Sequence, residues 1–182
     1  MLVTRDPKEI LAADKVVLPG VGSFGDAMEN LHHFGLVPVI HQVVQEQTPF
    51  LGICLGLQLL FEKSEESPGV EGLGILKGEI LRIPAAEGLK IPHMGWNNIR
   101  FPNKGRLFAG VPEDAYVYFV HSYYLKAQDE KIVTATTEYG THIHASVESG
   151  NLFACQFHPE KSSHVGLQIL KNFAKLEGKG GR

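Results

Sequence analysis

A cysteine with a glycine two residues away on each side is the first feature of this sequence that could do chemistry. Cys54 lies in residues 50–61, FLGICLGLQLLF, after a short apolar run and before a helical pattern of leucines. Gly52 and Gly56 lack side chains, which allows a strand-to-helix turn to close tightly at Cys54. This is the layout of a nucleophile elbow, with cysteine in the place of serine.

The predicted turn gives Cys54 an environment that favours reactivity. The positive end of a helix dipole lowers the pKa of a thiol, and the N–H of Leu55 points to the place where an oxyanion would form. The alternative is that Cys54 is a small buried hydrophobe, which is the usual state of an unpaired cysteine. Cys155 has no such turn, and we expect it to be buried and inert.

A cysteine nucleophile needs a base, and the base needs a partner that orients it. His158 and Glu160 offer both, directly after the strand expected at residues 152–157. Pro159 between them interrupts regular structure and sets the spacing of the imidazole and the carboxylate. The alternative is a solvated loop histidine beside a helix-capping glutamate. The elbow makes the catalytic interpretation the stronger one.

Residues 20–25, GVGSFG, match the G-x-G-x-x-G spacing of a dinucleotide-binding turn that follows a strand and precedes a helix. The next expected strand, however, ends in Ile53-Cys54, where a ribose-binding acidic residue would be needed. We therefore expect a glycine-rich turn, with backbone N–H groups aimed at the Cys54 site.

Three further motifs have weaker interpretations. His142 and His144 alternate on one strand, but no third ligand is obvious and we expect no metal. Ser122, in VHSYY at residues 120–124, has no elbow and is better placed to contact substrate than to act as a nucleophile. Trp96, in HMGWNN at residues 93–98, belongs either to the core or to a surface that faces a partner.

Composition limits the remaining possibilities. The chain has 182 residues, 43% of them hydrophobic, with a net charge of −3, so we expect one packed domain over residues 1–182. No basic stripe suggests nucleic acid, and we see neither an apolar run of membrane-spanning length nor a secretory signal. Two cysteines are too few for a disulfide scaffold, so we expect a cytoplasmic protein.

The elements that must position these residues follow from hydrophobic periodicity and capping signals. Strands are expected at residues 1–4, 15–18, 49–53, 80–83, 95–100, 116–120, 131–136, 142–147 and 152–157. Helices are expected from Asp6-Pro7 onward, at 26–33, after the elbow, and at 163–176, with a loop-rich stretch at 69–78. This order predicts an α/β three-layer sandwich around a mixed, largely parallel sheet with antiparallel additions.

The elbow at Cys54 and the His158-Pro159-Glu160 sequence together resemble the triad glutamine amidotransferases. Four stretches resemble more narrowly the glutaminase subunits of imidazole glycerol phosphate synthases: PGVG at 19–22, HMGWN at 93–97, HSYY at 121–124 and HPEKS at 158–162. The resemblance covers essentially the whole chain. HMGWN and VHSYY are its most specific parts, because many relatives share the elbow and His-Pro-Glu.

The resemblance implies that a triad of Cys54, His158 and Glu160 hydrolyses glutamine without a cofactor. The ammonia would pass to a (βα)8-barrel cyclase subunit, in a heterodimer that makes imidazole glycerol phosphate and AICAR in histidine biosynthesis. The implied site residues are Leu55, Val21 and Gly22 for the oxyanion, Gln58, Glu66, His121, Ser122 and Tyr123 for the substrate, and Trp96, Tyr118 and Lys161 for the cyclase interface.

The sequence departs from the family at its start. The family opens with a further strand and helix, whose glycine-asparagine turn faces the partner, and this sequence begins after that unit. Two alternatives follow. The chain could be another triad glutaminase, such as the vitamin B6 type. That type would share Cys54 and His158 but would not require the sequence around Trp96 and Tyr123. It could also be a partner-docking module without activity.

Overall fold

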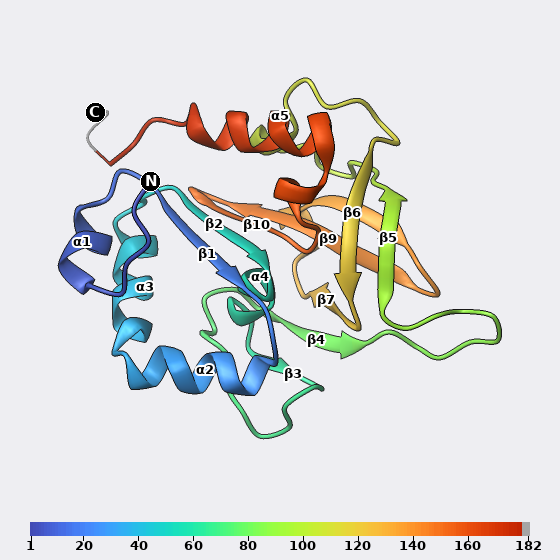
Figure 1. Cartoon of the computed structure of the whole chain (residues 1–182), viewed down its shortest axis with the longest axis horizontal. Helices are drawn as coiled ribbons and strands as arrows, with labels where there is room; N and C mark the ends of the chain where they lie inside the picture. The colour runs from blue at the N-terminus through green and yellow to red at the C-terminus, as the bar shows by residue number, and fades with distance from the viewer. Residues whose placement is uncertain (180–182) are drawn as a thin grey trace.

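A computed structural model describes residues 1–179, so residues 180–182 of the predicted domain lie outside it. Its main feature is a mixed eight-stranded sheet, beside a separate two-stranded ribbon (Figure 1). The sheet runs β1 (Val16–Gly20), β2 (Phe50–Cys54), β10 (Leu152–Cys155), β9 (His142–Ser149), β7 (Tyr123–Ala127), β4 (Gly78–Arg82) and β3 (Lys63–Ser64), and β8 (Val133–Glu138) pairs with β9. The ribbon consists of β5 (His93–Asn98) and β6 (Tyr116–His121).

Helices lie on both sides of the sheet (Figure 1). The α-helices are α1 (Pro7–Ala12), α2 (Phe24–His33), α3 (Leu36–Gln45), α4 (Leu55–Leu59) and α5 (Ser163–Ala174), and the short 3-10 turns are η1 (Arg106–Phe108), η2 (Glu130–Ile132) and η3 (Pro159–Lys161). The predicted cap of α1 is present, because Asp6 accepts a hydrogen bond from the Lys8 N–H at 2.7 Å.

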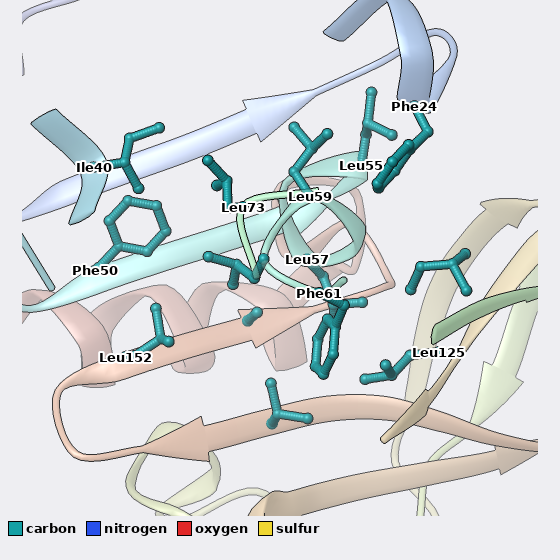
Figure 2. Packing of buried hydrophobic residues seen from close by; sticks show 14 of the residues in the cluster. Phe24, Ile40, Phe50, Leu55, Leu57, Leu59, Phe61, Leu73, Leu125 and Leu152 are labelled. Atoms are coloured by element: carbon teal, nitrogen blue, oxygen red, sulfur yellow. The ribbon is translucent and has the colours of Figure 1, made fainter. Parts of the chain in front are cut away.

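Alternation along the central strands divides the core into two clusters. Phe50 of β2 and Leu152 of β10 face a cluster that includes side chains of α2, α3 and α4 (Figure 2). Leu51 and Phe153 face the opposite cluster, which includes side chains of β6 and α5. Both faces of these strands are therefore covered, and the predicted three-layer α/β sandwich is confirmed.

The sheet is mixed, as predicted, but less parallel than we expected. Parallel pairing joins β1 to β2, β2 to β10, and β3 to β4. The pairings of β10 with β9, β9 with β7, β7 with β4 and β8 with β9 are antiparallel. The reason is that the second half of the chain connects its strands without crossover helices, so that neighbouring strands run in opposite directions.

Strand register places the ends of three strands at one edge of the sheet. Gly20 of β1 lies opposite Cys54 of β2, and Cys155 of β10 lies opposite Ile53. Because the three strands are parallel, the residues that follow each of them emerge at the same edge. This edge positions the glycine-rich turn, the elbow and the His158 turn side by side.

Some predicted elements differ from the structure. Residues 1–4 form no strand, because within the described residues no neighbouring strand pairs with them. Helix α3 and strands β3 and β7 were not predicted. The remaining predicted strands and helices are present, with ends that shift by a few residues, as at β10, which ends at Cys155 and not at residue 157.

Candidate active site

Cys54 occupies a strained turn between β2 and α4. Its backbone angles are φ 56° and ψ −110°, a combination that residues other than glycine avoid and that costs about 1–3 kcal/mol. A Cβ on Gly52 would lie 2.8 Å from the Gly56 carbonyl oxygen, and one on Gly56 would lie 2.0 Å from the Leu18 carbonyl oxygen. Both glycines are therefore required by close backbone approach, and the predicted nucleophile elbow is confirmed.

The electrostatics of Cys54 differ from our expectation. Burial raises the pKa of the Cys54 thiol above its usual value, and the Glu160 carboxylate acts in the same direction. The Leu55 N–H, the Gln156 amide and the Lys161 charge lower this pKa, but burial outweighs them. The predicted lowering of the thiol pKa is wrong for this resting state, in which the protonated thiol is favoured.

Hydrogen bonds at one ring nitrogen and at the backbone hold His158 in place. Its Nδ1 lies 2.7 Å from Glu160 Oε1, and since a carboxylate only accepts, Nδ1 carries the proton. The His158 N–H donates to the Tyr118 carbonyl at 2.9 Å, while the Ser162 hydroxyl donates to the His158 carbonyl at 2.6 Å. The Tyr118 N–H in turn donates to that hydroxyl at 2.9 Å. These bonds tie the histidine turn to β6.

The other ring nitrogen of His158 is available for chemistry. His158 Nε2 is buried and has no hydrogen-bond partner among residues 1–179. Buried polar atoms are nearly always paired, so an unpaired one at a pocket points to a reacting partner. Since Nδ1 carries the proton, Nε2 presents a lone pair that can accept one.

A single pocket of about 380 Å³ brings the predicted residues together. Its lining includes Cys54, His158 and Lys161, and all the residues predicted for the oxyanion and the substrate, which are Leu55, Val21, Gly22, Gln58, Glu66, His121, Ser122 and Tyr123. Pro92 and Val120, which were not predicted, complete the wall. The size suits a small amino acid.

Two of the predicted substrate residues already have partners in the protein. Glu66 Oε2 accepts a hydrogen bond from the Phe24 N–H at 2.8 Å, at the first turn of α2. Gln58 Nε2 donates to the Tyr123 carbonyl at 3.2 Å and to Gln156 Oε1 at 3.0 Å. Each side chain therefore has one oxygen that is not used in these bonds and that can accept from a substrate ammonium.

His121 forms part of a directional chain of hydrogen bonds in the pocket wall. Its Nδ1 lies 2.8 Å from the Tyr123 carbonyl, so this nitrogen donates, and its Nε2 accepts from His93 Nδ1 at 3.0 Å. His93 Nε2 then accepts from the Asn97 amide at 3.3 Å. Burial lowers the pKa of both His93 and His121 to about 4, which keeps the pair neutral. Both ring nitrogens of His121 are engaged within the protein while the residue lines the pocket, and its contact with the substrate stays a prediction.

The outer face of the ribbon β5–β6 carries exposed aromatic side chains. Trp96 is 52% exposed, so its orientation is that of a surface residue and not of a core residue. It lies opposite Tyr118 in the ladder, with ring centroids 6.1 Å apart. Lys161 Nζ is 6.0 Å from the Tyr118 ring, and Met94 and Tyr116 are exposed on the same ribbon. We call the surface formed by these residues the aromatic face; it consists of Met94, Trp96, Tyr116, Tyr118 and Lys161.

Sequence reasoning missed Gln156, Ser162 and His93. Gln156 is a fully buried polar residue in an otherwise apolar run before His158, which was the one available signal. Ser162 is also fully buried, and His93 lies between the rings of Phe119 and Tyr139, 4.7 and 3.9 Å away between centroids. Each of them also has a partner far away in sequence, which is Gln58 for Gln156, Tyr118 for Ser162 and His121 for His93, and no local pattern could reveal these contacts.

The remaining candidate groups have structural surroundings. Cys155 is fully buried and unpaired, as predicted. His142 pairs with Glu138, and His144 accepts from the Ala127 N–H at 3.0 Å. Within residues 1–179, no group of three or more His, Cys, Asp or Glu side chains is arranged to hold a metal. The same residues form no helix long and apolar enough to cross a membrane.

The fold, with a cysteine elbow in the same pocket as a histidine that is paired with a glutamate, is typical of α/β proteins of the cysteine–histidine–glutamate class, and comparison with known families agrees. The model of the family "Glutamine amidotransferase class-I" matches residues 3–176, and the chain belongs to that family. The family and the enzymatic nature predicted from the sequence are thus confirmed.

Curated relatives are more specific. The imidazole glycerol phosphate synthase subunit HisH of Moorella thermoacetica is 58% identical, over 96% of this chain and 82% of the relative. The proteins of the same name from Methanocaldococcus jannaschii and Aquifex aeolicus are 47% and 50% identical, over 97% and 96% of this chain and 87% and 84% of theirs. The predicted resemblance to these synthase subunits is therefore confirmed.

Solved structures support the fold. A crystal structure of a glutamine amidotransferase has a TM-score of 0.69 at 19% identity, over 94% of this chain and 85% of the other. The glutaminase domain of Trypanosoma brucei CTPS, with bound acivicin, has a TM-score of 0.65 at 18% identity, over 94% and 75%.

Proposed function

We propose that the chain is the glutaminase subunit of an imidazole glycerol phosphate synthase and hydrolyses glutamine through Cys54, His158 and Glu160. The observation that carries this proposal is the strained elbow of Cys54 in the same pocket as His158, whose buried Nε2 has no partner in the part of the chain that the structure describes. A nucleophile on a tight turn and a base with a free lone pair are the two parts that acyl transfer requires.

The first half of the reaction forms a thioester. The Cys54 thiol gives its proton to His158 Nε2, and the sulfur attacks the side-chain amide carbon of glutamine. The N–H of Leu55 and that of Val21 or Gly22 stabilise the tetrahedral oxyanion. The intermediate then collapses, the carbon–nitrogen bond breaks, and His158 gives its proton to the departing nitrogen, which leaves as ammonia.

The second half restores the enzyme. His158 removes a proton from a water molecule, whose oxygen attacks the thioester carbon. The carbon–sulfur bond breaks, glutamate leaves, and the proton on His158 returns to the Cys54 sulfur. Glu160 accepts the hydrogen bond from His158 Nδ1 throughout and stabilises the charged imidazolium. In this order of steps, a thiol that burial keeps protonated can still act as the nucleophile, because His158 removes its proton when the substrate binds.

The amino-acid end of glutamine is assigned to the far side of the pocket. The carboxylate of Glu66 and the free oxygen of Gln58 suit the substrate ammonium, while Ser122 and Tyr123 line the wall beside them. The neutral His93–His121 pair holds this wall without placing a second positive charge near the ammonium.

The ammonia is assigned to a cyclase subunit of (βα)8-barrel form, in a heterodimer, for the formation of imidazole glycerol phosphate and AICAR in histidine biosynthesis. The naming of the relatives as synthase subunits supports this assignment. The aromatic face offers the docking surface, since exposed Trp and Tyr are typical interface anchors and Lys161 joins this face to the pocket. A shielded transfer keeps ammonia from being protonated by water.

Docking is also expected to control activity. Gly22 has φ +94° and open space around it, so the peptide between Val21 and Gly22 can rotate between presenting a carbonyl and an N–H to the site. Loss of one oxyanion donor costs about 10²–10³-fold in rate. A cyclase that holds its nucleotide substrate would favour the N–H orientation, which is a shift of population.

The experiment measures glutamate release from glutamine by the chain alone, with cyclase, and with cyclase plus its nucleotide. We expect near inactivity alone and a rise of about 10²–10³-fold in the full mixture. The Cys54→Ala variant is the control and should release no glutamate in any mixture. Equal rates in all three mixtures would contradict control by the partner, and activity of Cys54→Ala would contradict the assigned nucleophile. No release in any mixture would leave only a docking role.

A further inference from the structure

Gln156 lies within hydrogen-bond range of the Cys54 sulfur, although it is not among the residues that line the pocket. In the sequence it follows β10 and precedes the His158 turn. Its side chain is fully buried, and its backbone N–H donates to the Ala145 carbonyl at 2.8 Å. Its side-chain Nε2 lies 3.7 Å from Cys54 Sγ, within hydrogen-bond range for sulfur. A buried amide aimed at a reactive sulfur needs an explanation beyond packing.

The orientation of the Gln156 amide is determined by its neighbours. The Tyr123 carbonyl can only accept, so the nitrogen of the Gln58 amide must face it, at 3.2 Å. The same nitrogen lies 3.0 Å from Gln156, which must therefore present its oxygen. Gln156 Nε2 then points to Cys54. Reversing either amide would place like atoms against each other.

A fixed donor beside a sulfur favours the thiolate over the thiol. Burial disfavours the negatively charged Cys54 thiolate most strongly. The Glu160 carboxylate also disfavours it, because both groups are negative. The groups that oppose these effects are the Leu55 N–H, the Gln156 amide and the Lys161 charge, which come from three different segments of the chain. Of these, Gln156 is the buried side chain, so water cannot replace its bond to sulfur.

We propose that Gln156 is a catalytic residue, whose amide donates to the Cys54 sulfur and holds the thiolate for attack, with Gln58 keeping that amide in the correct orientation. The proton of the thiol still goes to His158, and Gln156 takes none. The effect on glutamine turnover rests on the proposed function, whereas the effect on the thiol does not. The proposal also gives Gln58 a second role, as a positioning residue for Gln156.

The test measures how fast iodoacetamide alkylates Cys54 in the full chain without glutamine, as a function of pH. Gln156→Leu keeps a side chain of similar size but removes the donor. A hydrogen bond to a charged group is worth enough to change the thiolate population about tenfold or more. We therefore expect the alkylation rate at pH 7 to fall about tenfold and the midpoint of the profile to move to higher pH. Cys155, which is fully buried, serves as an internal reference for unfolding.

Three more variants separate the interpretations. Gln156→Glu accepts from Gln58 but places a carboxylate beside the sulfur, so its loss should exceed that of Gln156→Leu. Gln58→Leu removes the hydrogen bond that orients the Gln156 amide, so the alkylation rate should fall by a smaller factor than in Gln156→Leu. Gln42→Leu, on helix α3 where the side chain pairs with Glu46, is the matched control and should leave the profile unchanged.

An alkylation profile that is the same in Gln156→Leu as in the wild type, with Cys155 still protected, would overturn the proposal. If Gln156→Leu does not fold, the alkylation profile of Gln58→Leu is compared with that of the control Gln42→Leu. Identical profiles for these two variants would also overturn the proposal. Failure of the proposed function looks different, because the complex with cyclase would then release no glutamate while the alkylation profiles still differed.

Discussion

The proton on Cys54 is the central problem at the scale of single residues. Burial and the Glu160 carboxylate favour the neutral thiol, whereas attack requires the thiolate. In the proposed mechanism this proton moves to His158, and the two members of the histidine–glutamate pair contribute unequally. The proposal assigns proton transfer to His158 and assigns to Glu160 only the orientation and stabilisation of the ring.

We expect His158→Ala to lose more activity than Glu160→Gln. General acid–base catalysis contributes about 10²–10⁴-fold, all of which His158→Ala removes. In Glu160→Gln the amide oxygen can still accept from Nδ1, and the Glu160 side chain is 48% exposed, so water can assist; we expect a loss of roughly tenfold. The measurement is the rate of glutamate release by each variant with cyclase at saturating glutamine. Equal or reversed losses would contradict these roles.

Much of the residue-level site followed from local sequence. The elbow needs glycines close to Cys54, and Glu160 lies two residues from His158, so both units are visible in short motifs. Gln156 and His93 were not accessible in this way. Gln156 acquires its role through Gln58, 98 residues away, and His93 through His121 on the neighbouring strand. Such contacts are determined by how distant elements pack, since Gln58 lies on α4 and His121 on β6.

At the scale of elements, the elbow depends on the close approach of α4 to β1. Gly56 lies at the start of α4, and the Leu18 carbonyl, which a Cβ on Gly56 would meet, belongs to β1. No side chain fits between them, so this contact sets how far the helix behind the nucleophile can move.

Gly56→Ala should therefore both destabilise the protein and impair catalysis. A Cβ would lie 2.0 Å from the Leu18 carbonyl oxygen, so α4 must shift, at a cost of roughly 1–3 kcal/mol in the free energy of unfolding. Urea unfolding measures this cost. Gly25→Ala is the control, because its nearest neighbour is the hydroxyl of Ser67, at the end of a short side chain. A Gly56→Ala protein as stable as Gly25→Ala would contradict the close-approach argument.

The elements that were missed share a cause. Helix α3, LVPVIHQVVQ, contains a proline and four valines, and both residue types have a low helix propensity. It forms because Val39, Ile40 and Val43 are buried against neighbouring elements, so tertiary packing overrides propensity. Strand β7 exists because β4 and β9 pair with it on either side. Elements with their own caps, such as α1 and α2, were predictable from sequence.

At the scale of the whole molecule, buried neutral histidines make stability depend on pH. Burial lowers the pKa of His93 and His121 from 6.5 to about 4, and it also lowers the pKa of the buried His144. Between pH 6.5 and 4 the unfolded chain therefore binds more protons than the folded chain. Stability is fully present above pH 6.5 and falls as the pH decreases through this window.

We expect the free energy of unfolding to fall by roughly 3 kcal/mol or less for each of His93 and His121 between pH 6.5 and 4. Urea midpoints across this range measure the loss. His93→Phe, which can stack between Phe119 and Tyr139, should give a shallower slope. A slope that His93→Phe leaves unchanged would show that other groups govern acid unfolding.

Strand β2 has a consequence for how this enzyme can be regulated. It is hydrogen-bonded to a parallel neighbour on each side, and all five of its residues are buried between the two core clusters. The amide hydrogens of β2 should therefore be among the slowest in the protein to exchange with solvent, because a central strand of this kind opens only on global unfolding. A partner docked on the surface cannot adjust the nucleophile by moving such a strand. Any signal must reach Cys54 through the turns around it, which are the glycine-rich turn after β1 and the His158 turn after β10.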